Sequence, residues 1–484
     1  MIGNPVRIAV SVTVCAIALA SCASMAPRYT RPQAPVPAQF RDAPAGESGA
    51  RPVAALDWRQ VFVDRKLRDV IALALDNNRD LRVAMLNIEQ ARATYRIQRA
   101  EMLPSIDASA NWAAQRGSVY TSGMGLPLVS RSISAEVGFS AWELDLFGRI
   151  RSLKNEALQT WLATEQAQRS TRMSLVAEVA GDWLAVDAYR QRLALARQTL
   201  DSQRETLRLT ELKHEQGVAS GVDLAQVQTS VESARTDVAS YSIALAQARN
   251  ALELVVGTPV SDELLPDEKG GEAVALAPLP VHLSSDVLLQ RPDVLYAEHR
   301  LEAANADIGA ARAAFFPTVS LTASAGRSSD QLSNLFNAGT RTWSFVPSIS
   351  IPIFHAGALK ASLDVAKIEK QIEVANYEKA IQTAFSEVAD ALAARVNIGE
   401  RIDAQHALVA VTQRRYMLAD MRWRSGVDSH LDALDAQRSL YGANQTLITL
   451  QLEEATNRVT LYKVLGGGAD AQSATTAGAL AQGR

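Results

Sequence analysis

Cysteine is nearly absent from this chain. Its 484 residues contain only two cysteines, Cys15 and Cys22, and both lie within or directly after an apolar segment at the N-terminus. If that segment is removed on export, Cys22 is the one thiol of the mature chain. A single thiol excludes an internal disulfide and a cysteine-based metal site.

Residue patterns that would carry catalysis or metal binding are also scarce. The six histidines are scattered, and no two of them have the His-x-x-x-His spacing that metal ligands on a helix use. There is no glycine-rich phosphate-binding loop and no Gly-x-Ser-x-Gly motif. The net charge of −3 gives no basis for nucleic-acid binding. The sequence therefore predicts no enzyme, no catalytic residues, no metal site and no nucleic-acid partner.

Long hydrophobic runs are missing too, apart from one at the N-terminus. The run from Ile8 to Ala20 follows Arg7 and is too short to span a bilayer comfortably. It ends in Leu19-Ala20-Ser21-Cys22, which resembles the lipobox of bacterial lipoproteins. We therefore predict a lipoprotein signal peptide over residues 1–21 and a covalent lipid on Cys22, with no other cofactor.

The residues after the lipobox extend this interpretation. Ala23 is not the aspartate that retains many lipoproteins in the inner membrane, so it favours the outer membrane. Residues 22–56 are rich in proline and alanine and predict an extended tether. The alternative is an ordinary secretory signal with an incidental cysteine.

Proline is absent, and glycine nearly so, from two stretches of equal length. One lies between Gly148 and Gly217 and the other between Gly357 and Gly426, each with 68 residues and a single internal glycine. Strong helix formers dominate both stretches. They predict helices over residues 149–216 and 358–425, far longer than the usual helix of about 10–14 residues. Their equal length indicates a duplicated unit.

The order of elements around each long helix repeats as well. We predict a first repeat over residues 57–256, a proline-rich linker over 257–283, a second repeat over 284–465 and a flexible tail over 466–484. Each repeat contains two strands and a helix that returns beside the long one. The predicted strands are residues 105–114, 132–142, 318–326 and 342–354, and the return helices are residues 222–256 and 430–465.

The four strands alternate between an apolar face and a face of small polar residues. Trp112, Trp142 and Trp343 lie near strand ends, and the alternation slips at Trp142, which predicts a β-bulge. Aromatic residues near strand ends and small polar residues on one face are typical of a transmembrane β-barrel, although a soluble sandwich also alternates. Four strands cannot close a barrel, since small barrels need about eight. A membrane-spanning sheet would thus require several subunits to share one barrel.

The turns after the long helices carry acidic residues. Asp223 and Asp432 occupy equivalent places in the two copies, where a carboxylate can cap a helix and favour its dipole. Asp428, Asp432 and Asp435 are also spaced three to four residues apart, so they are predicted to share one helical face. Around a symmetric tube, that face would form rings of carboxylates that select cations. Both interpretations remain open on spacing alone.

Several motifs together resemble the TolC-like outer-membrane factor family, in the lipoprotein branch (OprM/NodT-like) of RND-type multidrug efflux systems. The resemblance covers nearly the whole mature chain, and each motif alone is weak. The motifs that carry it are the lipobox, Pro27-Arg28-Tyr29-Thr30-Arg31-Pro32, Trp142-Glu143-Leu144-Asp145-Leu146-Phe147-Gly148, Gln290-Arg291-Pro292-Asp293, Ala314-Phe315-Phe316-Pro317, Ile349-Ser350-Ile351-Pro352-Ile353-Phe354, Leu434-Asp435-Ala436-Gln437-Arg438 and Leu461-Tyr462-Lys463-Val464-Leu465-Gly466.

The resemblance implies a mainly α fold with a transmembrane β part. Three chains would form a 12-stranded outer-membrane β-barrel continuous with a 12-helix periplasmic α-barrel. It implies an efflux duct that docks on a periplasmic adaptor and an inner-membrane pump of RND type. The positions that match the family's periplasmic gate are Leu431, Asp432 and Asp435, with Asp223 and, less directly, Asp428 as latch positions.

Two other classes of protein share some of these features. A periplasmic adaptor also has a lipid anchor and a long helical hairpin, but it has one hairpin rather than two. A structural coiled-coil lipoprotein without a pore would show heptads through both long helices and would have no use for four alternating strands. The duplicated strands favour the duct.

Overall fold

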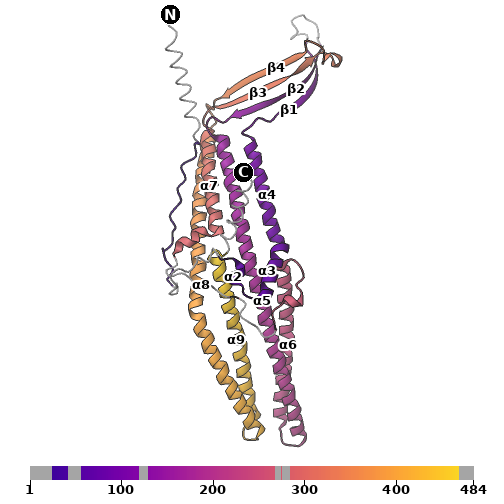
Figure 1. Ribbon diagram of the computed structural model, residues 1–484, viewed down its shortest axis with the longest axis vertical. Helices are drawn as coiled ribbons and strands as arrows, with labels where there is room; N and C mark the ends of the chain where they lie inside the picture. Colours follow the sequence, from indigo (N-terminus) through magenta and orange to yellow (C-terminus); the bar gives the residue numbers. More distant parts are fainter. Residues whose placement is uncertain (1–23, 42–55, 119–128, 268–273, 275–283, 468–484) are drawn as a thin grey trace. The chain divides into compact units, whose positions relative to one another are not determined.

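The computed structural model describes residues 24–41, 56–118, 129–267, 274 and 284–467. The chain, which is coloured along its sequence in Figure 1, divides into two compact units. The first unit contains Asn87–Glu165, Tyr296–Tyr377 and the described residues up to Gln33, and the second contains the remainder. The predicted signal peptide, Cys22 and nearly all of the predicted C-terminal tail lie outside the described residues.

The chain is mainly helical, and its elements follow the same order twice. Each copy has a helix, two strands, a long helix and a return helix. The first copy is α4 (Arg79–Ala100), β1 (Asp107–Arg116), β2 (Val129–Leu144), α5 (Arg149–Glu215) and α6 (Gly221–Val256). The second copy is α7 (Pro292–Ala313), β3 (Thr318–Ser329), β4 (Arg341–Ser350), α8 (Ala358–Arg424) and α9 (His430–Val464). The two long helices, α5 and α8, each have 67 residues.

The four strands form one antiparallel sheet in the order β1-β2-β3-β4 (Figure 1). In its register, Ala108 lies opposite Val137, Val137 opposite Ala325, and Ala325 opposite Trp343. Residues of the predicted apolar face therefore stay on one side across all four strands. Both edges of the sheet, β1 and β4, have no strand beside them in the described chain.

The bulge predicted at Trp142 is confirmed. The register of β2 against β3 shifts between Phe139 and Trp142. Ala141 takes a φ of 51°, and its N–H donates to the hydroxyl of Thr322 at 2.9 Å instead of to a ladder carbonyl. The extra residue returns Trp142 to the same face as Phe139, because it shifts the alternation by one position.

The strand bounds differ from those expected at the loop ends of the sheet. Strands β1, β2 and β3 extend to Arg116, Val129 and Ser329, beyond the alternating apolar residues that defined the predicted ends. Polar and charged residues continue the strands there without continuing the apolar pattern. At the other end β1 begins at Asp107, two residues later than predicted.

Strand β4 is shorter than predicted. It ends at Ser350 rather than at residue 354, just before the segment that contains Pro352. Pro347 lies within the regular ladder opposite Leu321. Because β4 is an edge strand of this sheet, a residue without an N–H can stand there without losing a ladder bond within the chain.

The described part of the second unit also contains four short helices. They are α2 (Trp58–Val61), α3 (Arg65–Asn77), η2 (Asp262–Leu264) and η3 (Ser285–Gln290). Asp64 caps α3 by accepting from the N–H of Leu67 at 2.9 Å. The face of α3 that includes Leu67 and Ile71 is fully buried, and α3 packs against α6. The predicted linker 257–283 is thus partly structured, since it holds η2 and a bridge between Val274 and Phe62.

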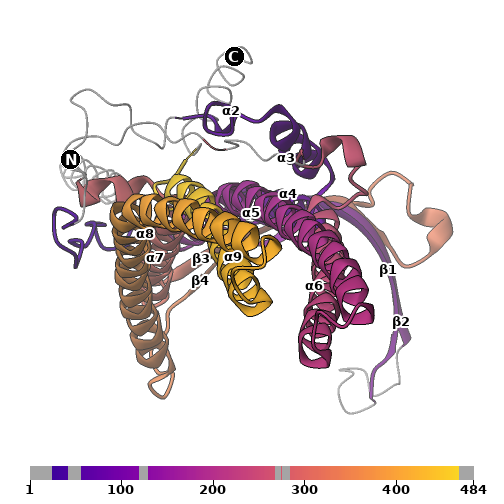
Figure 2. The ribbon, with the colours of Figure 1, turned by 90° about the horizontal axis from the view of Figure 1, so that it is seen from below.

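Within the second unit, each long helix packs against its return helix (Figure 2). Leu200 of α5 packs with Val231 and Ala234 of α6. In the other hairpin, the amide of Gln405 on α8 donates to the carbonyl of Ala443 on α9 at 2.7 Å. The hairpins also contact each other through side-chain hydrogen bonds, such as Gln203 on α5 to Gln437 on α9 at 2.6 Å. Among the described helices, none is both long and apolar enough to cross a membrane.

Candidate functional site

The two helix-ending turns have the same backbone construction. Gly217 and Gly426 both take a φ of +75°, which only glycine adopts without steric cost. The N–H of Val218 donates to the carbonyl of Lys213 at 2.8 Å, and the N–H of Val427 donates to that of Arg422 at 2.9 Å. Each turn is therefore a Schellman motif that closes its long helix at the same point.

Before each return helix, a serine hydroxyl donates to the aspartate three residues later. Ser220 caps α6 by accepting from the N–H of Asp223, and Asp223 accepts from the N–H of Ser220 at 3.1 Å, so the two form a capping box. The hydroxyl of Ser220 donates to the Asp223 carboxylate at 2.7 Å, and this hydrogen bond together with the one from the Ser220 N–H lowers the pKa of Asp223. In the second copy, the hydroxyl of Ser429 donates to Asp432 at 2.9 Å. The equivalence of Asp223 and Asp432 is thus local: both act at the start of a helix.

Asp428 does not share a helical face with Asp432 and Asp435, and this part of the prediction is wrong. Helix α9 begins at His430, so Asp428 lies in the turn before it. There its carboxylate accepts from Arg422, with Nη2 to Oδ1 at 2.8 Å, and this hydrogen bond lowers the pKa of Asp428. The spacing of the acids predicted a shared helical face, but Asp428 precedes the return helix that was itself predicted from residue 430, and a turn separates Asp428 from α9.

The other proposed gate residues lie at the start of α9. Asp435 accepts from Arg415 of α8 at 2.6 Å, while Leu431 is 59% exposed. Asp223, Asp428, Asp432 and Asp435 therefore each have a hydroxyl or guanidinium partner within the chain. Such partners compensate like-charge repulsion if several carboxylates are brought together.

One contact at these turns was not recognised in the sequence. Trp423 is only 8% exposed, and its ring contacts two side chains of other helices. The amine of Lys213 on α5 lies 4.6 Å from the ring centroid, and the ring of His430 on α9 lies 4.6 Å away. Cation–π attraction of this kind joins the first hairpin to the second.

Part of this contact could have been found from the repeat. Shifting the first copy by the spacing between Gly217 and Gly426 places Lys213 on Arg422 and Gly221 on His430. The second copy therefore has a ring where the first has a glycine. The packing between the two hairpins is the part that the sequence does not contain.

We expect acidification to loosen this contact. Burial lowers the pKa of His430; Asp223 and Asp420 oppose that shift, and Lys213 adds to it. A histidine whose folded pKa is depressed contributes stability that is present above its unfolded value of about 6.5 and is lost as the pH falls below it. Hydrogen exchange at residues 420–432, corrected for intrinsic rates, should therefore be roughly two- to fivefold faster at pH 5.5 than at pH 7.5.

The control for this pH effect is His430→Gln, which keeps a polar side chain but removes the titrating group. Asp223 stays ionised across this range because its pKa is lowered. The pH dependence should then disappear in the variant. Equal acceleration in His430→Gln and in the unmodified protein would contradict the assignment to His430.

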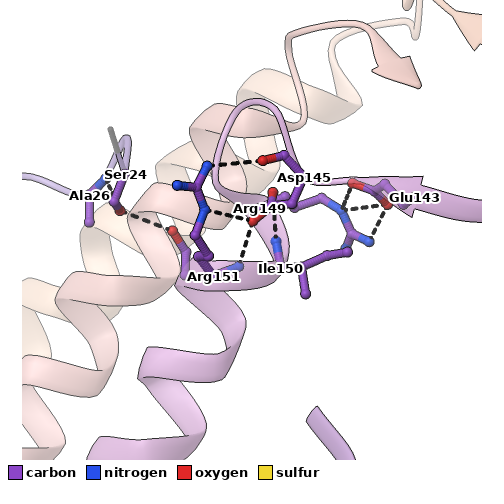
Figure 3. Close-up of polar contacts among 8 residues, drawn as sticks. Ser24, Ala26, Glu143, Asp145, Arg149, Ile150 and Arg151 are labelled. Atoms are coloured by element: carbon purple, nitrogen blue, oxygen red, sulfur yellow. Dashed lines mark hydrogen bonds and ion pairs between the residues drawn. The ribbon is translucent and has the colours of Figure 1, made fainter. Parts of the chain in front are cut away.

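The second candidate region is the junction between β2 and α5 in the first unit (Figure 3). Arg149 donates to both carboxylate oxygens of Glu143, with Nη2 to Oε2 at 2.6 Å. The carboxylate of Asp145 accepts from the backbone N–H groups of Ile150 and Arg151 at 3.2 and 2.9 Å, and from Nε of Arg151 at 3.0 Å. Asp145 thus caps α5 while two ion pairs fix the strand to the helix.

A metal centre has no support among the residues that the structure describes, because no group of three or more histidine, cysteine, aspartate or glutamate side chains converges there. The residues of the two candidate regions cap helices, join hairpins and connect the sheet to the long helices.

Comparison with known proteins gives consistent matches. A family model described as outer membrane efflux protein matches residues 70–258 and 283–467. The chain is 48% identical over 462 residues to the probable efflux pump outer membrane protein TtgC of Pseudomonas putida, with 95% of each chain covered. It is 43% identical to the outer membrane protein OprJ of Pseudomonas aeruginosa, over 95% of this chain and 96% of that one.

A solved structure agrees with these matches. The open state of the MtrE outer membrane channel of Neisseria gonorrhoeae superposes with a TM-score of 0.83 at 38% identity. The superposition covers 92% of this chain and 98% of that one.

Proposed function

Because the chain belongs to the outer membrane efflux protein family, we propose that it acts as a trimeric efflux duct rather than as an enzyme. In this proposal, three copies share one outer-membrane barrel of 12 strands, and their helices form a periplasmic tunnel. The observation that carries the proposal is the duplicated order of two strands, long helix and return helix. The outer-membrane location follows from the same family.

The open edges of the sheet support a shared barrel. A four-stranded sheet leaves the outward-facing N–H and C=O groups of β1 and β4 unpaired, and each unpaired group costs several kcal/mol in lipid. Pairing β4 of one copy with β1 of the next would satisfy both edges. The apolar face fits contact with lipid, since Trp343 and Ile349 are 80% and 66% exposed in the single chain.

The paired hairpins support a gated tunnel whose periplasmic gate contains Leu431, Asp432, Asp435, Asp428 and Asp223. In this proposal the closed state is held by the Lys213–Trp423 contact and the Arg415–Asp435 ion pair. A partner that binds the open state more tightly would shift the equilibrium towards opening. The exposed side chain of Leu431 would narrow the closed tunnel.

The partners are proposed to be a periplasmic adaptor and an inner-membrane pump of RND type. The turns expose apolar side chains that a partner could cover: Val218, Val222, Val427 and Leu431 are 73%, 78%, 63% and 59% exposed. A covalent lipid on Cys22 would add an outer-membrane anchor, and no other cofactor is proposed.

The gate is tested by replacing Asp432 and Asp435 together with alanine. We expect single-channel conductance in planar bilayers to rise about twofold or more and cation preference to fall, because a charged constriction selects cations. The matched control, Asp201→Ala with Glu232→Ala, removes two carboxylates from exposed pairs on α5 and α6. Unchanged currents in the gate variant would overturn the gate assignment.

The same preparation tests the duct itself. The unmodified protein should migrate as a detergent-dependent, heat-modifiable trimer from outer-membrane fractions and should conduct. A monomer without conductance would favour an adaptor or a structural lipoprotein instead.

A further inference from the structure

Four arginines lie on one face of the sheet, in the half nearer the β1–β2 and β3–β4 loops. Arg327 and Arg341 are opposite each other, and Arg131 and Arg116 lie four and six register positions further towards the loops. In the strand register, Arg116 and Arg131 share the face of Trp112 and Ile133, and Arg327 and Arg341 share it with Ala135. We call Arg116, Arg131, Arg327 and Arg341 the loop-end arginines. They lie on the apolar face, opposite to the face that carries Ser109 and Glu136.

The loop-end arginines have few partners. Arg116, Arg131 and Arg341 are exposed, and no carboxylate forms an ion pair with them among the residues that the structure describes. Arg327 is half-buried and donates to the carbonyl of Asn337 and the hydroxyl of Thr340 at 3.2 and 3.3 Å. The sequence between β1 and β2 contains no aspartate or glutamate.

At the opposite end of the same sheet, arginines form ion pairs with carboxylates. Arg149 and Arg151 there are held by Glu143 and Asp145 at 2.6 and 3.0 Å. Among the described residues, a carboxylate thus pairs with each of these two arginines at the helix end but with none of the four at the loop end. Arg327 and Arg341 even lie directly opposite each other, a placement that is unfavourable for like charges. An external anion would remove that cost.

The position of the loop-end arginines along the barrel axis determines which part of the membrane they contact. This step rests on the proposed function, in which the apolar face contacts lipid. At roughly 3.3 Å per residue and a tilt of about 40°, Arg341 would lie roughly 20 Å beyond Ile349 along the barrel axis. That distance nearly crosses the apolar band of about 25 Å. Arg341 would therefore lie at the outer boundary, two residues beyond Trp343, where arginine costs little.

We propose that the loop-end arginines bind the phosphate groups of lipopolysaccharide in the outer leaflet. Lipid A, the membrane-embedded part of this glycolipid, carries phosphates at the boundary between its acyl chains and its sugars. A guanidinium matches a phosphate through two parallel hydrogen bonds, which a lysine cannot reproduce. The exposed rings of Trp112 and Trp343 lie on the same face, nearer the middle of the membrane than Arg116 and Arg341. Tryptophan at that position suits the membrane–water interface of the same lipid.

The test uses the purified trimer in detergent and three lipid probes: bisphosphorylated lipid A, lipid A without phosphates and phosphatidylglycerol. We expect the unmodified protein to bind bisphosphorylated lipid A at least tenfold more tightly than either other probe, as measured by native mass spectrometry. The variant Arg116→Gln/Arg131→Gln/Arg341→Gln should lose that preference. The corresponding triple lysine variant should recover only part of it.

The controls separate this proposal from the proposed duct. Arg28→Gln/Arg96→Gln/Arg414→Gln removes the same charge from exposed arginines elsewhere and should bind lipid A as the unmodified protein does. Trimer migration and conductance are measured for every variant. If the glutamine variant is a conducting trimer that binds bisphosphorylated lipid A as tightly as the unmodified protein does, the lipid site is overturned and the duct is not. Equal binding of phosphatidylglycerol also overturns it, whereas loss of trimer and conductance in the unmodified protein refutes the duct.

Discussion

Replacing Arg291 with methionine should destabilise the second unit by about 2–4 kcal/mol. The Arg291 side chain is only 6% exposed and joins three elements. It donates to the carbonyl of Val464 at the end of α9 at 2.8 Å, to Glu387 of α8 at 2.7 Å and to Asp293 at the start of α7 at 2.6 Å.

The electrostatics of this site explain the expected loss. Burial by itself would lower the pKa of Arg291, but hydrogen bonds and charges from Asp293 and Glu387 outweigh it, and the net shift is upward. Methionine fills most of the volume but leaves the carbonyl of Val464 and the carboxylate of Glu387 without this donor. The carboxylate of Asp293 keeps the N–H of Val294. The end of α9 also loses a cation that favours its dipole.

Hydrogen exchange at Leu461–Leu465 measures the effect directly, and we expect it to accelerate at least about tenfold. The matched control is Arg235→Met, which removes an arginine from an exposed pair with Glu232 on α6. An exposed pair of this kind contributes about 0–1 kcal/mol, so exchange should hardly change. Equal effects of the two substitutions would show that burial of Arg291 does not matter.

The sequence was most informative about elements whose signal is local. The lack of proline between Gly148 and Gly217 is sufficient to predict a helix, and α5 runs through that stretch as Arg149–Glu215. The slip of alternation at Trp142 likewise located the bulge. Both signals depend on neighbouring residues, so no knowledge of tertiary contacts was needed.

Errors arose where charge interrupted an apolar pattern. Arg131 and Arg327 belong to strands, but as charged residues on the apolar face they hid the strand ends. The prediction that Asp428 shares a helical face with Asp432 was wrong for a related reason. It relied on the regular spacing of the acids, although Gly426 ends the long helix and Asp428 lies in the turn that follows. In both cases the backbone continued or stopped independently of the side-chain pattern.

The packing between the repeats could not be predicted from the sequence. Lys213, Trp423 and His430 are separated by up to 217 positions (430 − 213) and meet only because the hairpins pack together. The lipid on Cys22 remains a prediction, since that residue lies outside the described residues. At these sites the sequence shows which residue types are present, whereas only the fold shows which residues they contact.

Replacing Arg31 with alanine should release the segment of residues 24–33 from α7 at a cost on the order of 2–3 kcal/mol. The carboxylate of Glu298 is 8% exposed and accepts both Nε and Nη2 of Arg31 at 2.7 Å. The hydroxyl of Tyr29 donates to the same carboxylate at 3.1 Å, and burial together with Glu298 raises the pKa of Tyr29. Without Arg31, Glu298 would be a buried charge with a single neutral donor.

Other contacts between α7 and the segment of residues 24–33 limit how much of that segment is released. Asn305 and Arg312 of α7 donate to the carbonyls of Pro27 and Met25 at 2.8 and 3.1 Å. Gly309 permits this approach, since a Cβ there would lie 2.7 Å from the backbone nitrogen of Ala26. We therefore expect exchange to accelerate most between Tyr29 and Gln33 and less near Ala26, where these bonds remain.

A double-mutant cycle separates lost contact from buried charge. Glu298→Gln alone should cost less than Arg31→Ala, because Arg31 is 48% exposed and can be hydrated. Combining both substitutions should recover about 1 kcal/mol or more of the loss in Arg31→Ala, since no buried charge then remains unpaired. Arg28→Ala, an exposed arginine of the same segment, should leave exchange unchanged. If the double variant is as unstable as the sum of the two single ones, the segment is held by its backbone contacts, and the ion pair with Glu298 contributes nothing specific.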